Sequence, residues 1–318
     1  MTGTTAKKKR KTFLKSKKER AKIIFCCAVL ALPVLQQLIF YIGVNFNSFL
    51  QAFQIYDYNQ TGLGYTVRFS FLENFKSAVE LVLRSSFIVK NSAIIYAVSI
   101  LISLPLALIF SFYIYKKFPL SGLFSVFLYM PQIVSALVFS LLFKYLTTEV
   151  YSTISYQLTG EYAEGLLLNQ NTRIPVLVFF NIWISFGVNI ILYSGAMAGI
   201  EPSIVESAEL DGTNLLQEFL HITFPMIFPT FISFIIIGLA GFCTNQANLY
   251  NLFGPQAQEL STIGYYIYAQ SNKADYVSTL SYASFGELSA LGIMLTLIVA
   301  PVTLGVKKLL EKIGPSVD

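Results

Sequence analysis

The sequence has little charge. Of its 318 residues, 12% are charged and 55% are apolar, whereas about 25% of an average soluble domain is charged. The uncharged residues form long blocks, which excludes an ordinary soluble globule and indicates that the bilayer is the solvent. Ten of the 22 Lys and Arg lie between Lys7 and Lys22, so the net charge of +5 comes from a basic tail. A basic face for nucleic acid is therefore not expected.

The residues of common catalytic and metal sites are also scarce. The three cysteines, Cys26, Cys27 and Cys243, lie in apolar context without a CxxC spacing, which argues against a disulfide framework. His221 is the single histidine, so an HExxH site is excluded. Neither a G-x-S-x-G elbow nor a G-x-x-x-x-G-K-[ST] phosphate loop occurs. The chain is expected to have no enzymatic site, cofactor or metal of its own.

Uncharged stretches near the length that crosses a bilayer, about 20 residues, occur six times. The sequence therefore predicts an all-α integral membrane protein with six transmembrane helices, at Ile23–Val44, Asn91–Tyr115, Phe118–Phe143, Ile174–Ile200, Ile222–Thr244 and Leu288–Val306. Pro131 is expected to loosen the third helix locally. The last helix begins earlier, near Val277, if Glu287 faces protein or water.

Basic residues predict the orientation, because cytoplasmic flanks of membrane helices collect Lys and Arg. With the N-terminus inside, fifteen basic residues lie on the inner side and seven on the outer side. Both termini are therefore expected in the cytoplasm. The chain divides into a basic tail (1–22), a first helix with an outer loop (23–90), a core (91–306) and a C-terminal tail (307–318). The outer loop is long enough to meet a partner, and could equally be an ordered cap.

One inner segment breaks the charge pattern. Residues 200–222 carry five acids and no Lys or Arg: Glu201, Glu206, Glu209, Asp211 and Glu218. An acidic loop suggests a basic partner protein, although a plain solvated helical loop would carry the same charges.

The same segment has the start and stop signals of a short helix. Pro202 suits a first helical turn, and Gly212 suits the position just past a helix end, where a left-handed backbone has no Cβ penalty. The sequence predicts a short cytoplasmic helix at Ser203–Leu210, a turn, and a second helix that leads through Pro225 into the fifth span. Such a helix is preformed to dock into a groove of a partner.

The residues from Glu206 to Gly212, Glu-Ser-Ala-Glu-Leu-Asp-Gly, resemble the EAA loop of permease subunits in binding-protein-dependent ABC importers. That pattern runs E-A-A-x-x-x-G with I-x-L-P downstream, which Ile222 and Pro225 match. Ser207 replaces the first alanine and Phe224 replaces the leucine.

Other strings resemble the carbohydrate-importing branch, such as the maltose and multiple-sugar permeases. Residues 71–75, Phe-Leu-Glu-Asn-Phe, are similar to its G-L-x-N-[FY] element. Asn181-Ile182-Trp183 and Gly254-Pro255 are also similar, although Phe253 stands where a second glycine is usual.

The resemblance implies a type I ABC importer permease fold and a set of partners. These are a second homologous permease, two cytoplasmic ATPases that bind ATP and Mg, and an external solute-binding protein, in a prokaryotic plasma membrane. The short helix would be the coupling helix, within the loop 201–225. Glu206 would face basic or polar groups of the ATPase, Ala208 would allow close packing and Gly212 would make the turn. The implied coupling residues are Glu206, Ser207, Ala208, Asp211 and Gly212.

Polar residues inside the spans are candidates for a cargo path, because such residues face the bundle interior or join helices. Asn181 and Ser185 lie on one stripe of the fourth helix. Amides, hydroxyls and aromatic faces would suit an uncharged carbohydrate, expected to be an oligosaccharide; helix packing is the alternative role. The candidates are Gln132, Ser135, Asn181, Ser185, Phe242 and Asn245.

Two other functions remain open. The same family could import glycerol phosphate or another small polar solute, but a phosphate would favour Arg or Lys in the path, and the six cores have none. An ATPase-independent carrier or channel is the other alternative. Ion-coupled carriers normally have ionisable groups inside their spans, which the six cores also lack.

Overall fold

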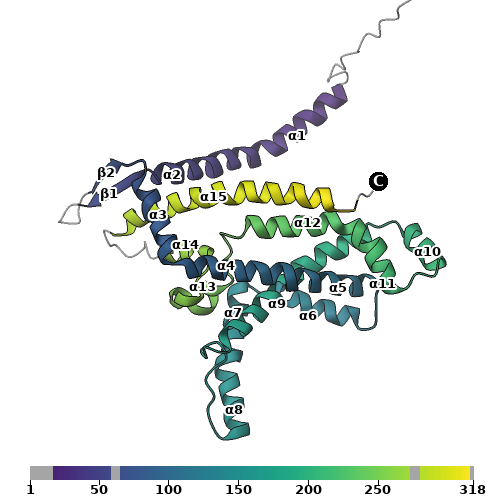
Figure 1. The fold of residues 1–318 in the computed structure, drawn as a ribbon. Helices are drawn as coiled ribbons and strands as arrows, with labels where there is room; N and C mark the ends of the chain where they lie inside the picture. The colour runs from purple at the N-terminus through teal and green to yellow at the C-terminus, as the bar shows by residue number, and fades with distance from the viewer. Residues whose placement is uncertain (1–16, 59–64, 273–279, 316–318) are drawn as a thin grey trace, which may run out of the picture.

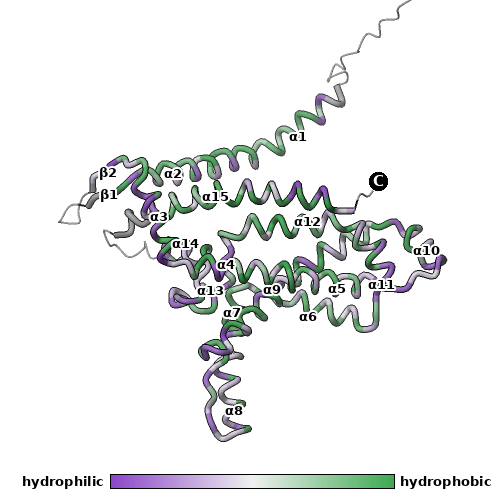
Figure 2. Tube along the Cα trace, in the orientation of Figure 1, coloured by the Kyte–Doolittle hydropathy of each residue, from purple (hydrophilic) through white to green (hydrophobic). Residues whose placement is uncertain are grey.

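Long apolar helices run side by side in the main body of the structure (Figures 1 and 2). The computed structural model describes residues 17–58, 65–272 and 280–315. Within these ranges, five helices are long and apolar enough to cross a membrane: Arg20–Gln51, Ser86–Tyr115, Arg173–Ala198, Leu215–Ala240 and Phe285–Ile313. These correspond to five of the six predicted spans.

The predicted third span, Phe118–Phe143, is not one continuous helix. Helix α6 (Ser121–Ile133) and helix α7 (Ala136–Tyr145) are bent by 106° at a short break. Val134 takes an extended backbone, and Pro131 just before it cannot donate to the preceding turn. The loosening predicted at Pro131 is therefore a full break, and the number of spans is six if the bent pair is one span. Helix α6 alone, with 13 residues, is about 20 Å long.

The first span stands apart from the rest. It comprises α1 (Lys17–Gln36), a π-helical segment (Gln37–Ile42) and α2 (Gly43–Gln51). Helix α1 diverges from the other helices in Figure 1, and the most apolar window of this span is wholly exposed. Within this span, α2 packs against the last helix.

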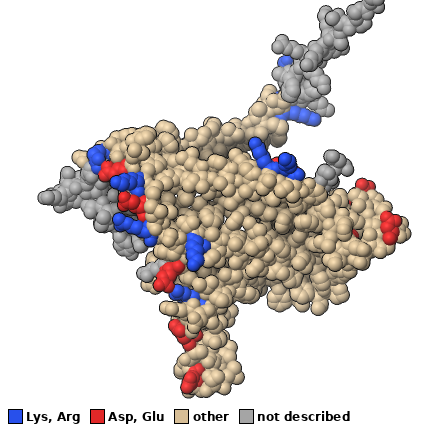
Figure 3. Space-filling view, in the orientation of Figure 1, with Lys and Arg blue, Asp and Glu red and all other residues tan. Residues whose placement is uncertain are grey.

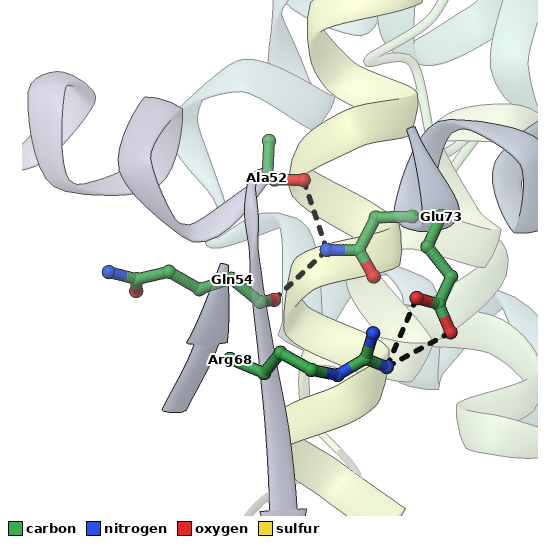
Figure 4. A network of polar contacts seen from close by, with 5 residues as sticks. Ala52, Gln54, Arg68 and Glu73 are labelled. Atoms are coloured by element: carbon green, nitrogen blue, oxygen red, sulfur yellow. Dashed lines mark hydrogen bonds and ion pairs between the residues drawn. The ribbon is translucent and has the colours of Figure 1, made fainter. Parts of the chain in front are cut away.

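A β-hairpin caps one end of the bundle, called here the hairpin end. Strands β1 (Gln54–Tyr58) and β2 (Tyr65–Phe69) pair antiparallel, and helix α3 (Glu73–Arg84) follows. The Asn74 amide, 5% exposed, donates to the carbonyls of Ala52 and Gln54 at 3.0 and 2.9 Å. Arg68 forms an ion pair with Glu73 at 3.1 Å (Figure 4). The hairpin was not predicted, because the six residues that connect its strands, 59–64, exceed the two to five residues typical of hairpin loops.

The last helix, α15 (Leu280–Ile313), packs against α3 and the hairpin. A Cβ at Gly286 would lie 2.7 Å from the Asn74 amide nitrogen and 2.8 Å from the Gln54 carbonyl oxygen, so this approach requires glycine. Glu287 lies half-buried beside Ala78 of α3. It faces protein, the condition on which an earlier start of this helix was predicted. The described helix begins at Leu280, and the predicted start near Val277 lies outside the described residues.

Helix α9 (Arg173–Ala198) forms the centre of the core. It packs against α5 (Leu104–Tyr115), α6 and α12 (Phe224–Ala240). Phe180 and Tyr193 of α9 are fully buried in two separate apolar clusters. Helix α4 (Ser86–Val98) joins α5 through a π-helical segment (Ser99–Ser103), and the three form one long span.

Shorter elements complete the structure. A π-helical segment (Leu146–Val150) and α8 (Tyr151–Thr159) prolong α7 into an arm that projects from the bundle in Figure 1. At the hairpin end lie α13 (Leu249–Phe253), two 3₁₀ turns (Gly254–Gln256 and Gln258–Leu260) and α14 (Ile263–Asn272). The opposite end carries α10 (Pro202–Leu210), α11 (Leu215–Glu218) and a π-helical segment (Phe219–Thr223).

Candidate functional site

Helix α10 is a separate short helix between two long apolar helices, at the end of the bundle called here the α10 end (Figure 1). The predicted range, Ser203–Leu210, agrees with the observed one, which begins at Pro202. Gly212 has φ +79°, the left-handed backbone expected of it. Its N–H donates to the Glu209 carbonyl at 3.1 Å. The predicted helix and turn are therefore confirmed.

The chain after Gly212 is fixed by local hydrogen bonds. The Thr213 N–H and hydroxyl both donate to the Ala208 carbonyl, at 3.1 and 2.7 Å. Asn214 and Gln217 form a reciprocal capping box at 2.9 Å each, which satisfies two backbone donors at the start of α11. Hydrogen bonds within this chain thus stabilise the turn in the absence of a partner protein.

The side chains of α10 divide into two groups. Val205 and Ala208 face the bundle, and Ala208 is 7% exposed, so its close packing occurs within this chain. Glu206, Ser207, Asp211 and Gly212 are exposed. Val205 belongs to the same apolar cluster as Tyr193 of α9, which attaches α10 to the core.

Large apolar side chains are exposed among these polar groups. Leu210 is 89% exposed, and Ile204, Leu215 and Leu216 are also exposed. Large apolar side chains exposed among polar ones are typical of interaction sites. The sequence analysis missed Leu210, although a large apolar residue in an otherwise acidic loop was a usable signal.

Two of the five acids of this segment face a cation of the same chain. Lys116, at the end of α5, has its Nζ 2.7 Å from Glu218 Oε1 and 3.4 Å from Glu209 Oε1. Partial burial alone lowers the pKa of the Lys116 amine, but the two carboxylates outweigh this effect and the net pKa is raised. Among the described residues, Glu201, Glu206 and Asp211 form no ion pair. Acidic side chains are visible on the surface at this end in Figure 3.

A cavity of about 230 Å³ lies between α4, the π-helical segment after it, α9 and residues 245–248. None of the twelve residues that line it is charged. Its polar lining consists of hydroxyls and amides: Ser99, Ser103, Asn181, Ser185, Asn245 and Asn248. Three of the six predicted path residues, Asn181, Ser185 and Asn245, therefore share one cavity.

Several polar groups of the cavity also join its walls. The Asn181 amide donates to the Leu177 and Ala247 carbonyls at 2.9 and 3.1 Å, and its oxygen accepts from Asn248 at 3.1 Å. The Ser103 and Ser185 hydroxyl oxygens lie 2.5 Å apart. Ala247 and Asn248 have positive φ, 50° and 55°; strained backbone of this kind is frequent at functional sites. No sequence pattern predicts this backbone conformation.

The other three predicted path residues lie elsewhere. Gln132 donates to the Ile184 carbonyl at 2.6 Å and so joins α6 to α9. Ser135 is exposed in the break between α6 and α7. The Phe242 ring packs edge-on against Tyr96, with centroids 5.9 Å apart. For all six, a role in a cargo path stays a prediction.

A metal site is not evident in the part of the chain that the structure describes, where no three His, Cys, Asp or Glu side chains could hold an ion together.

A polar cavity within a bundle of apolar helices is characteristic of membrane transport proteins. Residues 99–318 match the family model of the binding-protein-dependent transport system inner membrane component. The chain belongs to this family, and it is a multi-pass membrane permease component.

Curated relatives match over part of their length. The chain is 27% identical over 175 residues to the arabinooligosaccharides transport system permease protein AraP of Bacillus subtilis, covering 54% of this chain and 53% of AraP. It is 25% identical over 174 residues to the multiple sugar-binding transport system permease protein MsmF of Streptococcus mutans, covering 52% and 60%. The chain thus spans about half the length of the curated relatives it matches.

Solved structures confirm the predicted fold class. A chain of a bacterial ABC transporter involved in the import of the acidic polysaccharide alginate aligns with a TM-score of 0.71, covering 93% of this chain and 98% of that one. A chain of the same kind of transporter, in complex with an alginate pentasaccharide-bound periplasmic protein, aligns with a TM-score of 0.69. At 18% identity in both cases, the likeness shows the fold alone.

Proposed function

We propose that this chain is one permease half of an ATP-driven importer for a carbohydrate, in particular an oligosaccharide. The observation that carries the proposal is α10, a preformed helix with exposed acidic and apolar side chains between two membrane helices. The names of AraP and MsmF support sugar as the cargo class. The chain would work beside a second, homologous permease.

Helix α10 would be the coupling helix of this importer. Glu206, Ser207 and Asp211 would face the cleft of a cytoplasmic ATPase, with Leu210 inserted into it. Ala208 would keep α10 attached to its own bundle, and Gly212 would set the direction of the next helix. ATP and Mg would be bound by two such ATPases and not by this chain.

This role requires the α10 end to be cytoplasmic. Both termini would then lie in the cytoplasm of a prokaryotic cell, with the chain in its plasma membrane. Lys307, Lys308 and Lys312 near the end of α15 support this orientation, because cytoplasmic flanks are rich in basic residues. The hairpin end would face an external solute-binding protein.

The cavity would hold a neutral cargo. Amides and hydroxyls line it without a charge, which suits the hydroxyl groups of a sugar. A glycerol phosphate cargo would need a cation to offset its own charge, so it fits this cavity less well.

The proposal is tested by copurification and uptake. The chain is co-expressed with the second permease, ATPase and binding protein encoded beside it, extracted in mild detergent and reconstituted. The expected result is an associated ATPase and ATP-driven uptake from a panel of arabinotriose, maltotriose and raffinose. An intact chain that retains no ATPase would favour the carrier or channel alternative and contradict the proposal.

A further inference from the structure

Lys116 connects three segments at the α10 end. It follows directly after α5, and its ammonium contacts Glu209 of α10 and Glu218 of α11. Helix α11 continues through a π-helical segment into α12. A single cation therefore lies between α5, the candidate coupling helix and the start of the next membrane helix.

The contact with Glu218 is buried. Glu218 is 2% exposed, and its Oε1 accepts no well-aligned hydrogen bond from the described residues. Lys116 is the only cation within ion-pair distance of it among those residues. A buried carboxylate needs such a partner, because an unpaired buried charge strongly destabilises the structure around it.

The contact with Glu209 is different in kind. The Glu209 side chain is largely exposed on α10, and its distance to Lys116 is longer, 3.4 Å. Exposed ion pairs of this kind contribute little. Glu218 therefore fixes the position of the Lys116 ammonium. Glu209 contacts the same ammonium from the exposed side and contributes little to its position.

Helix α5 leads from Lys116 back to the cavity. Ser103, which precedes α5, lines the cavity and contacts Ser185 of α9. Ser103 and Lys116 are 13 residues apart on this continuous helix, or about 20 Å at the helical rise. A displacement of α10 that is passed to Lys116 would therefore reach a wall of the cavity along one rigid element.

We propose that Lys116 is a positioning residue for energy coupling, held by Glu218. The ion pair keeps α5 and the start of α12 moving together when an ATPase moves α10, which the hydrogen-bonded turn after Gly212 joins to α11. This inference rests on the proposed function of α10. Lys116 would transmit a movement of α10 to the membrane helices, and it would not contribute to binding of the ATPase.

The test uses the reconstituted importer with its second permease, ATPases and binding protein. Uptake of the best transported trisaccharide of the panel is measured per ATP hydrolysed, in Lys116→Met, Lys116→Arg and Lys117→Met variants. Lys117 is a matched control because it is the next residue, carries the same charge, is exposed and forms no ion pair among the described residues. All complexes are first normalised for the ATPase that copurifies.

Lys116→Met should lower uptake per ATP by about 5- to 150-fold, the usual range for coupling between two sites. Lys116→Arg should restore most of it, and Lys117→Met should leave it unchanged. Lys116→Met alone leaves the buried Glu218 carboxylate unpaired, which could destabilise the fold. The double variant Lys116→Met with Glu218→Met removes both charges and therefore separates loss of coupling from misfolding. It should insert and retain ATPase like the wild type, yet remain uncoupled.

Two other outcomes are distinguishable. Equal uptake per ATP in Lys116→Met and Lys117→Met complexes that retain ATPase would overturn the role of Lys116 while leaving the proposed function in place. The same holds if the double variant couples normally. A wild-type chain that retains no ATPase would contradict the proposed function, and this inference with it.

Discussion

Replacement of Gly212 tests the coupling turn most directly. Its φ of +79° is left-handed, and a Cβ added there meets nothing within 4 Å. Alanine would therefore strain only the backbone, by about 1–2 kcal/mol, which shifts the equilibrium of the turn by roughly 5- to 30-fold. Proline would be worse, because its φ is fixed near −65°. It would also remove the N–H that donates to Glu209.

The expected results follow this order. Gly212→Ala should reduce ATP-driven uptake several-fold, and Gly212→Pro should abolish it, with the chain still inserted in the membrane. The reason is that the direction of the chain after α10 depends on this turn. The assay is sugar uptake into proteoliposomes, normalised to the amount of inserted chain, together with stimulation of ATP hydrolysis by the binding protein.

Gly160 provides a control with the same left-handed φ. It ends α8 with φ +78°, its N–H donates to the Tyr156 carbonyl at 2.9 Å, and a Cβ there also meets nothing within 4 Å. Gly160→Pro should therefore impose the same strain on the arm without loss of coupling. Normal uptake by Gly212→Pro, or an equal loss in both proline variants, would refute the reasoning.

Three further substitutions test separate parts of the molecule. Leu210→Asp should reduce the ATPase retained in copurification by about 10- to 100-fold, because burial of a leucine is worth about 1.5–3 kcal/mol; full retention would exclude Leu210 from the interface. Asn74→Leu should lower the thermal unfolding midpoint in detergent, because each buried carbonyl left unsatisfied costs about 1–3 kcal/mol; an unchanged midpoint would contradict the role of Asn74 as the tie between hairpin and α3. Ser185→Lys should block uptake of neutral trisaccharides while ATPase retention stays normal, since it places a charge in the cavity; unaltered uptake would place the cargo path elsewhere.

Local signals in the sequence were sufficient for α10. Pro202 and Gly212 mark its two ends by their own backbone preferences, and the helix lies where they place it. Helical periodicity likewise placed Asn181 and Ser185 on one wall of a cavity. The apolar length of five spans was equally local information.

Features that depend on packing between distant segments could not be predicted. The ion pair of Lys116 with Glu218 joins residues from different helices. The local sequence around either residue does not predict its partner. The hairpin depends on the fit of Asn74 against Gly286 of a helix far along the chain. Pro131 predicts a local weakness, but the 106° bend brings α7 against α13, and no local signal predicts that contact between distant segments.

One helix carries both parts of the candidate site. Asn181 and Ser185 of α9 line the cavity, and the same helix continues to Tyr193 and Met197, which pack in one cluster with Val205 of α10. A close-packed core of this kind transmits displacement because it is not continuously deformable. Under the proposed function, a movement of α10 would therefore reach the cavity along two routes, through α9 by packing and through α5 by the Lys116 ion pair.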